Sequence, residues 1–298
     1  MSVLSLVRHG LLALGVCWLT ACKFSVLEQQ GPREPEFERI GASQSIVFIH
    51  GMYLTPDAWA PWQDFFEAQG YTTYAPAWPL HELSVMEQNQ QHPSAALGEL
   101  TLEDVLNRYR NFLLELDEKP IVIGHSMGGL IAQLLLQEGR VSGAVALHSA
   151  PPYGVISAEP AFLKANWAML NPLIPAGEPQ QLTLKQFQYG FVNGMDAEQQ
   201  QAVFERFVVP ESRRVGRSTL TRAASLDLAV ARGPLLLVAG GEDRTITARL
   251  NYANFDAYEA TPAITDYRQY PERNHWTLGM AGWEIVAGDV LDWIEQQR

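Results

Sequence analysis

Gly124-His125-Ser126-Met127-Gly128-Gly129 is the stretch of this 298-residue sequence that decides its fold. It lies between an apolar run, Pro120-Ile121-Val122-Ile123, and a helix-like run over residues 130–136. The order predicts a strand, a sharp turn and a helix with Ser126 at the apex, and G-x-S-x-G in that context is the pattern of a nucleophile elbow. A serine at such an apex has a strained backbone, and the flanking glycines avoid clashes where strand and helix meet.

Strand-like and helix-like segments alternate from residue 45 onward, which predicts a mostly parallel sheet with helices on both faces. The predicted strands are 45–49, 71–76, 121–123, 141–147, 235–239 and 267–270, and the helices around them are 56–69, 100–116, 130–136 and 283–296. Residues 151–232 break the alternation with many prolines and short helical pieces. We therefore expect an α/β domain over 45–298, with a helical cap insertion at about 151–232 over the carboxyl edge of the sheet, where ligands bind.

The first 21 residues have the pattern of a signal peptide, with Arg8 and His9 before a short apolar run over 10–19. The run Leu19-Thr20-Ala21-Cys22 resembles a bacterial lipobox, which implies acylation of Cys22 and a lipid anchor in the membrane. Residues 22–44 are polar and suit a tether. The expected location is the bacterial cell envelope, on the outer-membrane or periplasmic side. An ordinary signal peptide, or a cytoplasmic protein with a misassigned start, is the alternative.

Composition narrows the classes of partner and cofactor. The net charge of −12 disfavours nucleic acid and gives no basic patch for anionic lipid headgroups. Both cysteines, Cys17 and Cys22, precede the predicted domain, so it has no disulfide framework. The histidines show no H-x-x-x-H or H-E-x-x-H spacing, and neither G-x-G-x-x-G nor a P-loop occurs. We therefore expect neither a metal nor an organic cofactor.

Four motifs in order resemble the α/β-hydrolase superfamily: His50-Gly51 after an early strand, the elbow, the turn Gly240-Gly241-Glu242-Asp243 after a late strand, and a histidine, His275, near the end. The resemblance implies the chain order Ser, acid, His. It assigns Ser126 as nucleophile, His275 as base and Asp243 as the orienting acid. Two other carboxylates compete with Asp243, and they are its neighbour Glu242 and the weaker candidate Asp227.

The same resemblance places the oxyanion hole at the backbone N–H groups of Met52 and Met127. Candidate pocket residues are large or polarisable side chains near the motifs: Tyr53, Trp78, His148, Trp167, Phe187, Tyr189 and Trp276. The implied reaction is hydrolysis of a small-molecule carboxylic ester or thioester with a mostly apolar, short-to-medium acyl chain. The alternatives are hydrolysis of an amide or C–C bond, perhydrolysis, and a catalytically inactive, membrane-tethered binding protein.

Overall fold

The computed structural model describes residues 39–258 and 263–298. The predicted signal peptide, Cys22 and most of the tether lie outside these ranges. Within the ranges, no helix is both long and apolar enough to span a bilayer.

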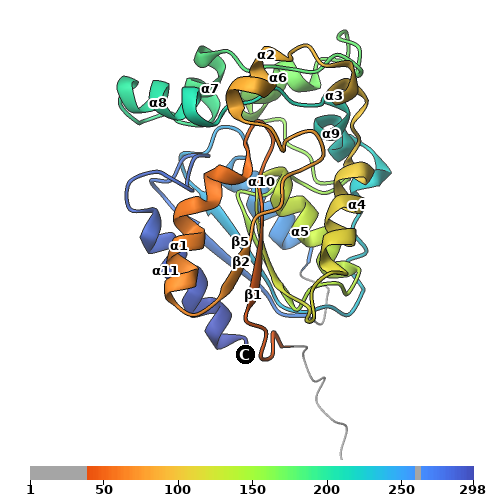
Figure 1. The fold of residues 1–298 in the computed structure, drawn as a ribbon, viewed down its shortest axis with the longest axis vertical. Coiled ribbons are helices and arrows are strands. Elements are labelled where there is room, and N and C mark those ends of the chain that lie inside the picture. The colour runs from red at the N-terminus through yellow and green to blue at the C-terminus, as the bar shows by residue number, and fades with distance from the viewer. Residues whose placement is uncertain (1–38, 259–262) are drawn as a thin grey trace, which may run out of the picture. The chain divides into compact units, whose positions relative to one another are not determined.

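A six-stranded sheet in the order β2-β1-β3-β4-β5-β6 forms the centre of the domain (Figure 1). All neighbouring strands are parallel, which confirms the predicted fold class. The strands are β1 (Ser45–Ile49), β2 (Thr72–Tyr74), β3 (Ile121–His125), β4 (Gly143–Leu147), β5 (Leu235–Gly240) and β6 (Thr265–Tyr270). The apolar strands β3, β4 and β5 are buried along their whole length, as expected for strands covered on both faces.

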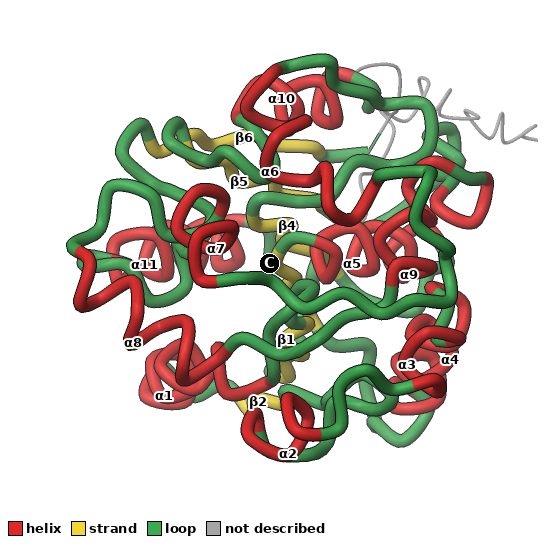
Figure 2. Tube along the Cα trace, turned by 90° about the horizontal axis from the view of Figure 1, so that it is seen from above, coloured by secondary structure: helices red, strands yellow, loops and turns green. Residues whose placement is uncertain are grey.

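Helices cover both faces of this sheet (Figures 1 and 2). One face carries α1 (Ala60–Ala68) and α11 (Trp283–Gln296), and the other carries α4 (Leu102–Leu113) and α5 (Met127–Gln137). A helix that the sequence analysis missed, α10 (Ala248–Asp256), packs against β5 and β6. On α4 the buried residues recur every three or four positions, so the helix presents one apolar face to the core.

The segment between β4 and β5 lies over the carboxyl ends of the strands (Figure 1). Its helices are α6 (Pro160–Leu170), α7 (Leu184–Gly190), α8 (Ala197–Phe207) and α9 (Arg213–Arg217), followed by two short 3-10 turns at Ser218–Leu220 and Arg222–Ala224. We call this segment, residues 151–232, the cap. A 3-10 turn at Pro56–Trp59 precedes α1.

Two short helices from an earlier part of the chain join the cap layer, α2 (Val85–Gln90) and α3 (Ala95–Glu99) (Figure 1). The Asn89 amide donates to the Val208 carbonyl at 3.0 Å, and Arg214 Nε donates to the Gly98 carbonyl at 3.0 Å. The sequence does not predict either helix, because five or six residues are too few to show helical periodicity.

Candidate active site

The turn from β3 into α5 places Ser126 at the carboxyl edge of the sheet. Ser126 has φ 57° and ψ −119°, a conformation that side-chain-bearing residues rarely adopt. The turn is tight enough to require glycine, because a Cβ on Gly124 would overlap the carbonyl of Gly128 and one on Gly128 would overlap the carbonyl of Ile49. The local pattern G-x-S-x-G therefore has a steric cause in the close approach of β3, α5 and β1.

The Ser126 hydroxyl, the His275 imidazole and the Asp243 carboxylate lie in a hydrogen-bonded series. Ser126 Oγ is 3.0 Å from His275 Nε2, and His275 Nδ1 is 2.7 Å from Asp243 Oδ2. An ionised carboxylate only accepts hydrogen bonds, so Nδ1 carries the proton and Nε2 is free to accept the serine proton. The three residues are buried, and they follow β3, β5 and β6, three strands that end at the same edge.

Asp243 is held as a carboxylate. Its Oδ1 accepts the backbone N–H groups of Thr245 at 2.8 Å and Ile246 at 2.9 Å. Burial favours the neutral form, but the charge interaction with His275 and the hydrogen bonds from His148 and His275 outweigh it and hold the pKa of Asp243 well below its usual range. The two competing carboxylates lie elsewhere: Glu242 and Asp227 are exposed, the latter in the loop before β5.

Residues of the cap hold the loops that carry these groups. The Asn193 side chain donates to the Glu242 carbonyl at 2.9 Å, and the Asn274 side chain donates to the Asn193 carbonyl at 2.9 Å. The ring of Phe191 stands edge-on to His275 with 4.7 Å between the ring centroids. The sequence does not single out Phe191, Asn193 or Asn274, because contacts between residues far apart in the chain leave no local motif.

The loop after β1 lies directly against the elbow. An added Cβ on Gly51 would come within 2.8 Å of Ser126 Cβ. The next residue, Met52, and the first residue of α5, Met127, both line the cavity beside Ser126. The N–H groups in the first turn of a helix have no acceptor within the helix. The structure therefore brings both predicted donor positions to the side of the serine.

A buried ion pair between Glu211 of the cap and His81 braces this loop, and the sequence analysis missed it. Tyr53 has a left-handed φ of 65°; its N–H donates to Glu211 Oε2 at 3.4 Å, and its carbonyl accepts the Val209 N–H at 3.0 Å. His81 Nε2 lies 3.3 Å from Glu211 Oε2, and His81 Nδ1 lies 3.1 Å from the Pro79 carbonyl. Burial by itself would lower the pKa of His81, but the Glu211 carboxylate outweighs burial and raises it, which favours the charged imidazolium.

A mainly apolar cavity of about 60 Å³ opens beside Ser126 between the sheet edge and the cap. Its apolar walls come from both layers and include Tyr53, Phe162, Met169, Leu182, Phe191 and Ile246. Polar groups at the wall are few and include Asn166, Thr219 and Thr245. Such a lining suits an apolar group placed next to a reactive hydroxyl.

Of the predicted pocket residues, only Tyr53 lines this cavity, and the structure places the others elsewhere. Trp78 is fully buried and stacks on His50 at 4.8 Å, and Trp276 packs on Phe207 at 4.9 Å. Trp167 lies on the outer face of α6 with 57% of its surface exposed. The two remaining aromatic candidates also serve packing: Phe187 stacks on Phe191, and Tyr189 lies under the ammonium of Lys164.

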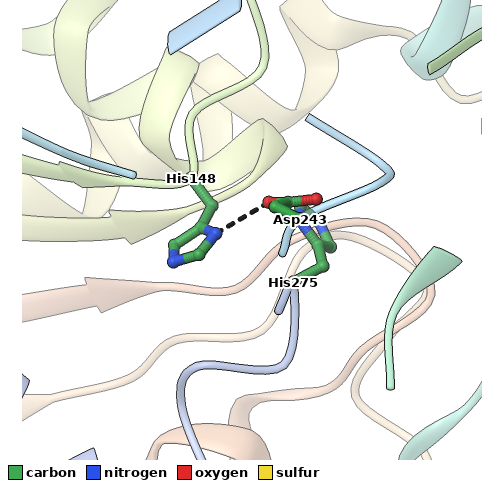
Figure 3. A group of neighbouring side chains, drawn as sticks. All are labelled: His148, Asp243 and His275. Atoms are coloured by element: carbon green, nitrogen blue, oxygen red, sulfur yellow. Dashed lines mark hydrogen bonds and ion pairs between the residues drawn. The ribbon is translucent and has the colours of Figure 1, made fainter. Parts of the chain in front are cut away.

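His148 lies behind the site instead of in the cavity. Its Nδ1 is 2.7 Å from Asp243 Oδ2, the same oxygen that His275 contacts (Figure 3). Together these three residues form the one group in the described part of the chain whose atoms could converge on a metal ion. Both Nδ1 atoms are at hydrogen-bond distance from an acceptor, so a metal there would have to displace two protons, and the geometry fits a hydrogen-bonded cluster.

Comparisons with known proteins agree with the fold. A family model described as "Alpha/beta hydrolase family" matches residues 46–283. No curated protein sequence matches the chain. Among solved structures, a monoacylglycerol lipase from Paleococcus ferrophilus is similar with a TM-score of 0.63 and 17% identity, over 87% of this chain and 98% of that one.

Two further structures show the same level of likeness. A polyneuridine aldehyde esterase mutant has a TM-score of 0.62 and 17% identity, over 84% of this chain and 98% of that chain. A pyrethroid hydrolase from Sphingobium faniae JZ-2 has a TM-score of 0.60 and 18% identity, over 85% of this chain and 98% of that chain. At these identities the likeness establishes the shared fold.

Proposed function

This chain belongs to the alpha/beta hydrolase family, and from the arrangement around Ser126 we propose that it is a serine hydrolase that cleaves a carboxylic ester, or a thioester, through an acyl-enzyme. The observation that carries the proposal is the hydrogen-bonded series from Ser126 Oγ to His275 and on to Asp243. Three solved structures with this fold are named as a lipase, an esterase and a hydrolase, which supports the reaction class.

In the proposed reaction, Ser126 Oγ attacks the carbonyl carbon while His275 Nε2 takes the hydroxyl proton. The Asp243 carboxylate stabilises the imidazolium that forms. The N–H groups of Met52 and Met127 stabilise the negative oxygen of the tetrahedral intermediate, and each such donor is worth about 3 kcal/mol by precedent. His275 then gives its proton to the departing alcohol. Water attacks the acyl group with His275 as base, which releases the acid and restores Ser126.

The cavity supports a short acyl group as the preferred substrate portion. Its volume of about 60 Å³ and its apolar walls accommodate a few methylene groups, whereas a long chain would require α6 and α7 to move apart. We expect kcat/KM on p-nitrophenyl esters to be highest for short-to-medium chains and to fall steeply beyond them. A preference for long acyl chains would contradict this assignment of the cavity.

Labelling with a fluorophosphonate probe tests the nucleophile directly. We expect the wild-type protein to be labelled at Ser126 and Ser126→Ala not to be, with ester hydrolysis reduced by about 10⁶-fold. Ser149→Ala is a matched control, because Ser149 is a buried serine at the same sheet edge whose hydroxyl bonds to Gln133 instead of an imidazole. Absence of labelling on a folded wild-type protein would favour an inactive binding protein.

Membrane anchoring through Cys22 is a separate proposal that rests on the sequence pattern alone. If it holds, the protein expressed in a bacterium partitions with envelope membranes, and Cys22→Ser releases it to a soluble fraction with its esterase activity intact. Unchanged partitioning of Cys22→Ser would remove the proposal without affecting the proposed reaction.

A further inference from the structure

His148 supplies a second imidazole to the carboxylate that holds His275. The residue comes directly after β4, is fully buried, and does not line the cavity. Its Nδ1 and that of His275 each lie 2.7 Å from the same oxygen, Asp243 Oδ2. Figure 3 shows the three side chains meeting at this point. His148 is therefore as close to the carboxylate as the proposed catalytic base is.

The backbone conformation of His148 directs its ring toward Asp243. Its φ is 48°, in the left-handed region that residues with a side chain rarely adopt. Its N–H still continues the sheet by donating to the Val238 carbonyl at 2.7 Å. Space for the ring comes from Gly240, where a Cβ would collide with His148 Cε1. The left-handed backbone of His148 and the absence of a side chain at Gly240 together allow the His148 ring to contact Asp243.

The protonation of this ring follows from its neighbours. A carboxylate accepts only, so His148 Nδ1 carries the proton. Its Nε2 is buried and has no hydrogen-bond partner among the described residues. A second proton there would leave a buried charge unsolvated, and burial accordingly lowers the pKa of His148. The ring is therefore a neutral, permanent donor.

The charged and titratable groups around the two imidazoles come from three places in the fold. Asp243 follows β5, His125 ends β3 with its ring 4.7 Å from that of His275, and Arg273 lies in the same loop as His275. His125 Nε2 donates to the His275 carbonyl at 2.8 Å and its Nδ1 has no partner among the described residues, so it too is neutral. Within residues 39–258 and 263–298, Asp243 is thus the one negative charge that faces both imidazoles.

We propose that His148 is a positioning residue: its Nδ1–H fixes the Asp243 carboxylate and occupies part of its hydrogen-bonding capacity, so that the carboxylate holds the imidazolium of His275 less strongly. The proposal rests on the proposed serine-hydrolase function. With two backbone N–H groups on Oδ1 and two imidazoles on Oδ2, the carboxylate has four donors and cannot rotate without losing one.

A pair of variants separates this role from simple packing. His148→Leu removes the donor, whereas His148→Asn retains one, because the Asn amide nitrogen is attached at Cγ as His Nδ1 is. The measurement is the pH dependence of kcat/KM for a short-chain ester. We expect the acid limb of His148→Leu to move up by about one pH unit, which is about a tenfold loss of activity on that limb, and that of His148→Asn to stay near wild type.

Two outcomes overturn the proposal. One is an acid limb at the same pH in all three proteins, and the other is an equal fall in kcat at every pH, which would indicate packing alone. Proton NMR of the wild-type protein gives a readout that needs neither activity nor a folded leucine variant. We expect two strongly downfield imidazole N–H resonances, of which His148→Asn loses one and Ser126→Ala loses none.

This spectrum also distinguishes the two proposals. Two downfield resonances in a protein that fluorophosphonate fails to label would retain the His148 bond and reject the serine-hydrolase function. A single resonance in a protein that is labelled at Ser126 would reject the role of His148 and retain the hydrolase.

Discussion

At the scale of single residues, Asp243 and Glu242 show how two adjacent carboxylates acquire different chemistry. Asp243 is buried and accepts four hydrogen bonds, two from backbone N–H groups and two from imidazoles. Glu242 is exposed, and only its backbone carbonyl is tied to the cap, through Asn193. Successive side chains in an extended turn point in opposite directions, so only one of the two can face His275.

Exchange of each carboxylate for its amide tests this difference. Asp243→Asn no longer fixes the Nδ1–H tautomer of His275 or stabilises its imidazolium, so we expect kcat to fall by about 10⁴-fold. Glu242→Gln should keep wild-type kcat and KM. A large loss of activity in Glu242→Gln, with little in Asp243→Asn, would move the acid to position 242. Circular dichroism on both proteins checks that they fold.

At the scale of elements, the loop after β1 depends on the cap for its conformation. Both backbone polar groups of Tyr53 bond to cap residues, the N–H to Glu211 and the carbonyl to Val209. Glu211 is itself held by paired backbone bonds with Gln180 at 2.7 Å. The loop that carries Met52 is therefore built jointly by two segments about 160 residues apart in the chain.

Removal of the Glu211 charge should harm both stability and turnover. Glu211→Gln leaves the His81 imidazolium buried without a counter-charge, which costs about 3–5 kcal/mol of unfolding free energy. We expect the urea midpoint of Glu211→Gln to be lower than that of the wild-type protein. We also expect kcat to fall by a larger factor than the affinity for a substrate analogue does. The exposed cap residue Glu198 gives the control variant, Glu198→Gln, which should match wild type.

A double-mutant cycle isolates the ion pair from other effects. If the pair acts as a unit, His81→Asn combined with Glu211→Gln should be less destabilised than the sum of the two single variants, because no unpaired charge remains. Strict additivity of the unfolding free energies would show that the two side chains act independently.

At the scale of the whole molecule, the buried histidines tie folding to pH. Burial lowers the pKa of His50 to about 3 and lowers those of His125 and His148. These three rings are neutral in the folded protein, but in the unfolded chain they take up protons below the ordinary value of 6.5. The unfolded state therefore binds more protons, and the stability that these histidines contribute is lost as the pH falls.

We expect the unfolding free energy to fall between pH 6.5 and pH 5 by about 1.4 kcal/mol per pH unit for each neutral histidine. His81 has the opposite sign: its raised pKa adds stability that is complete below 6.5 and is lost as the pH rises through the raised value. Urea unfolding at several pH values measures how steeply the unfolding free energy changes with pH. His148→Asn should reduce this slope by the contribution of one histidine. A flat profile over this range would contradict the neutral state of these rings.

The amino-acid sequence by itself determined the parallel α/β sheet and the glycine-flanked turn that carries Ser126, and it predicted Asp243 and His275 as the partners of that serine. Each of these features is encoded by a few neighbouring residues. The signals are alternating apolar segments, a glycine-flanked turn and short motifs that follow strands. The last helix shows how strong such a signal is, because α11 spans the residues that its periodicity predicts.

Only the tertiary structure decided which side chains surround the site. His148 meets Asp243 across 95 positions, Tyr53 meets Glu211 across 158, and Phe191 reaches His275 from the cap. Contacts of this kind arise when segments far apart in the chain pack at one edge of the sheet. Periodicity and motif spacing therefore cannot predict them. For the same reason most of the aromatic residues predicted to line the pocket pack elsewhere, while other cap residues line the cavity.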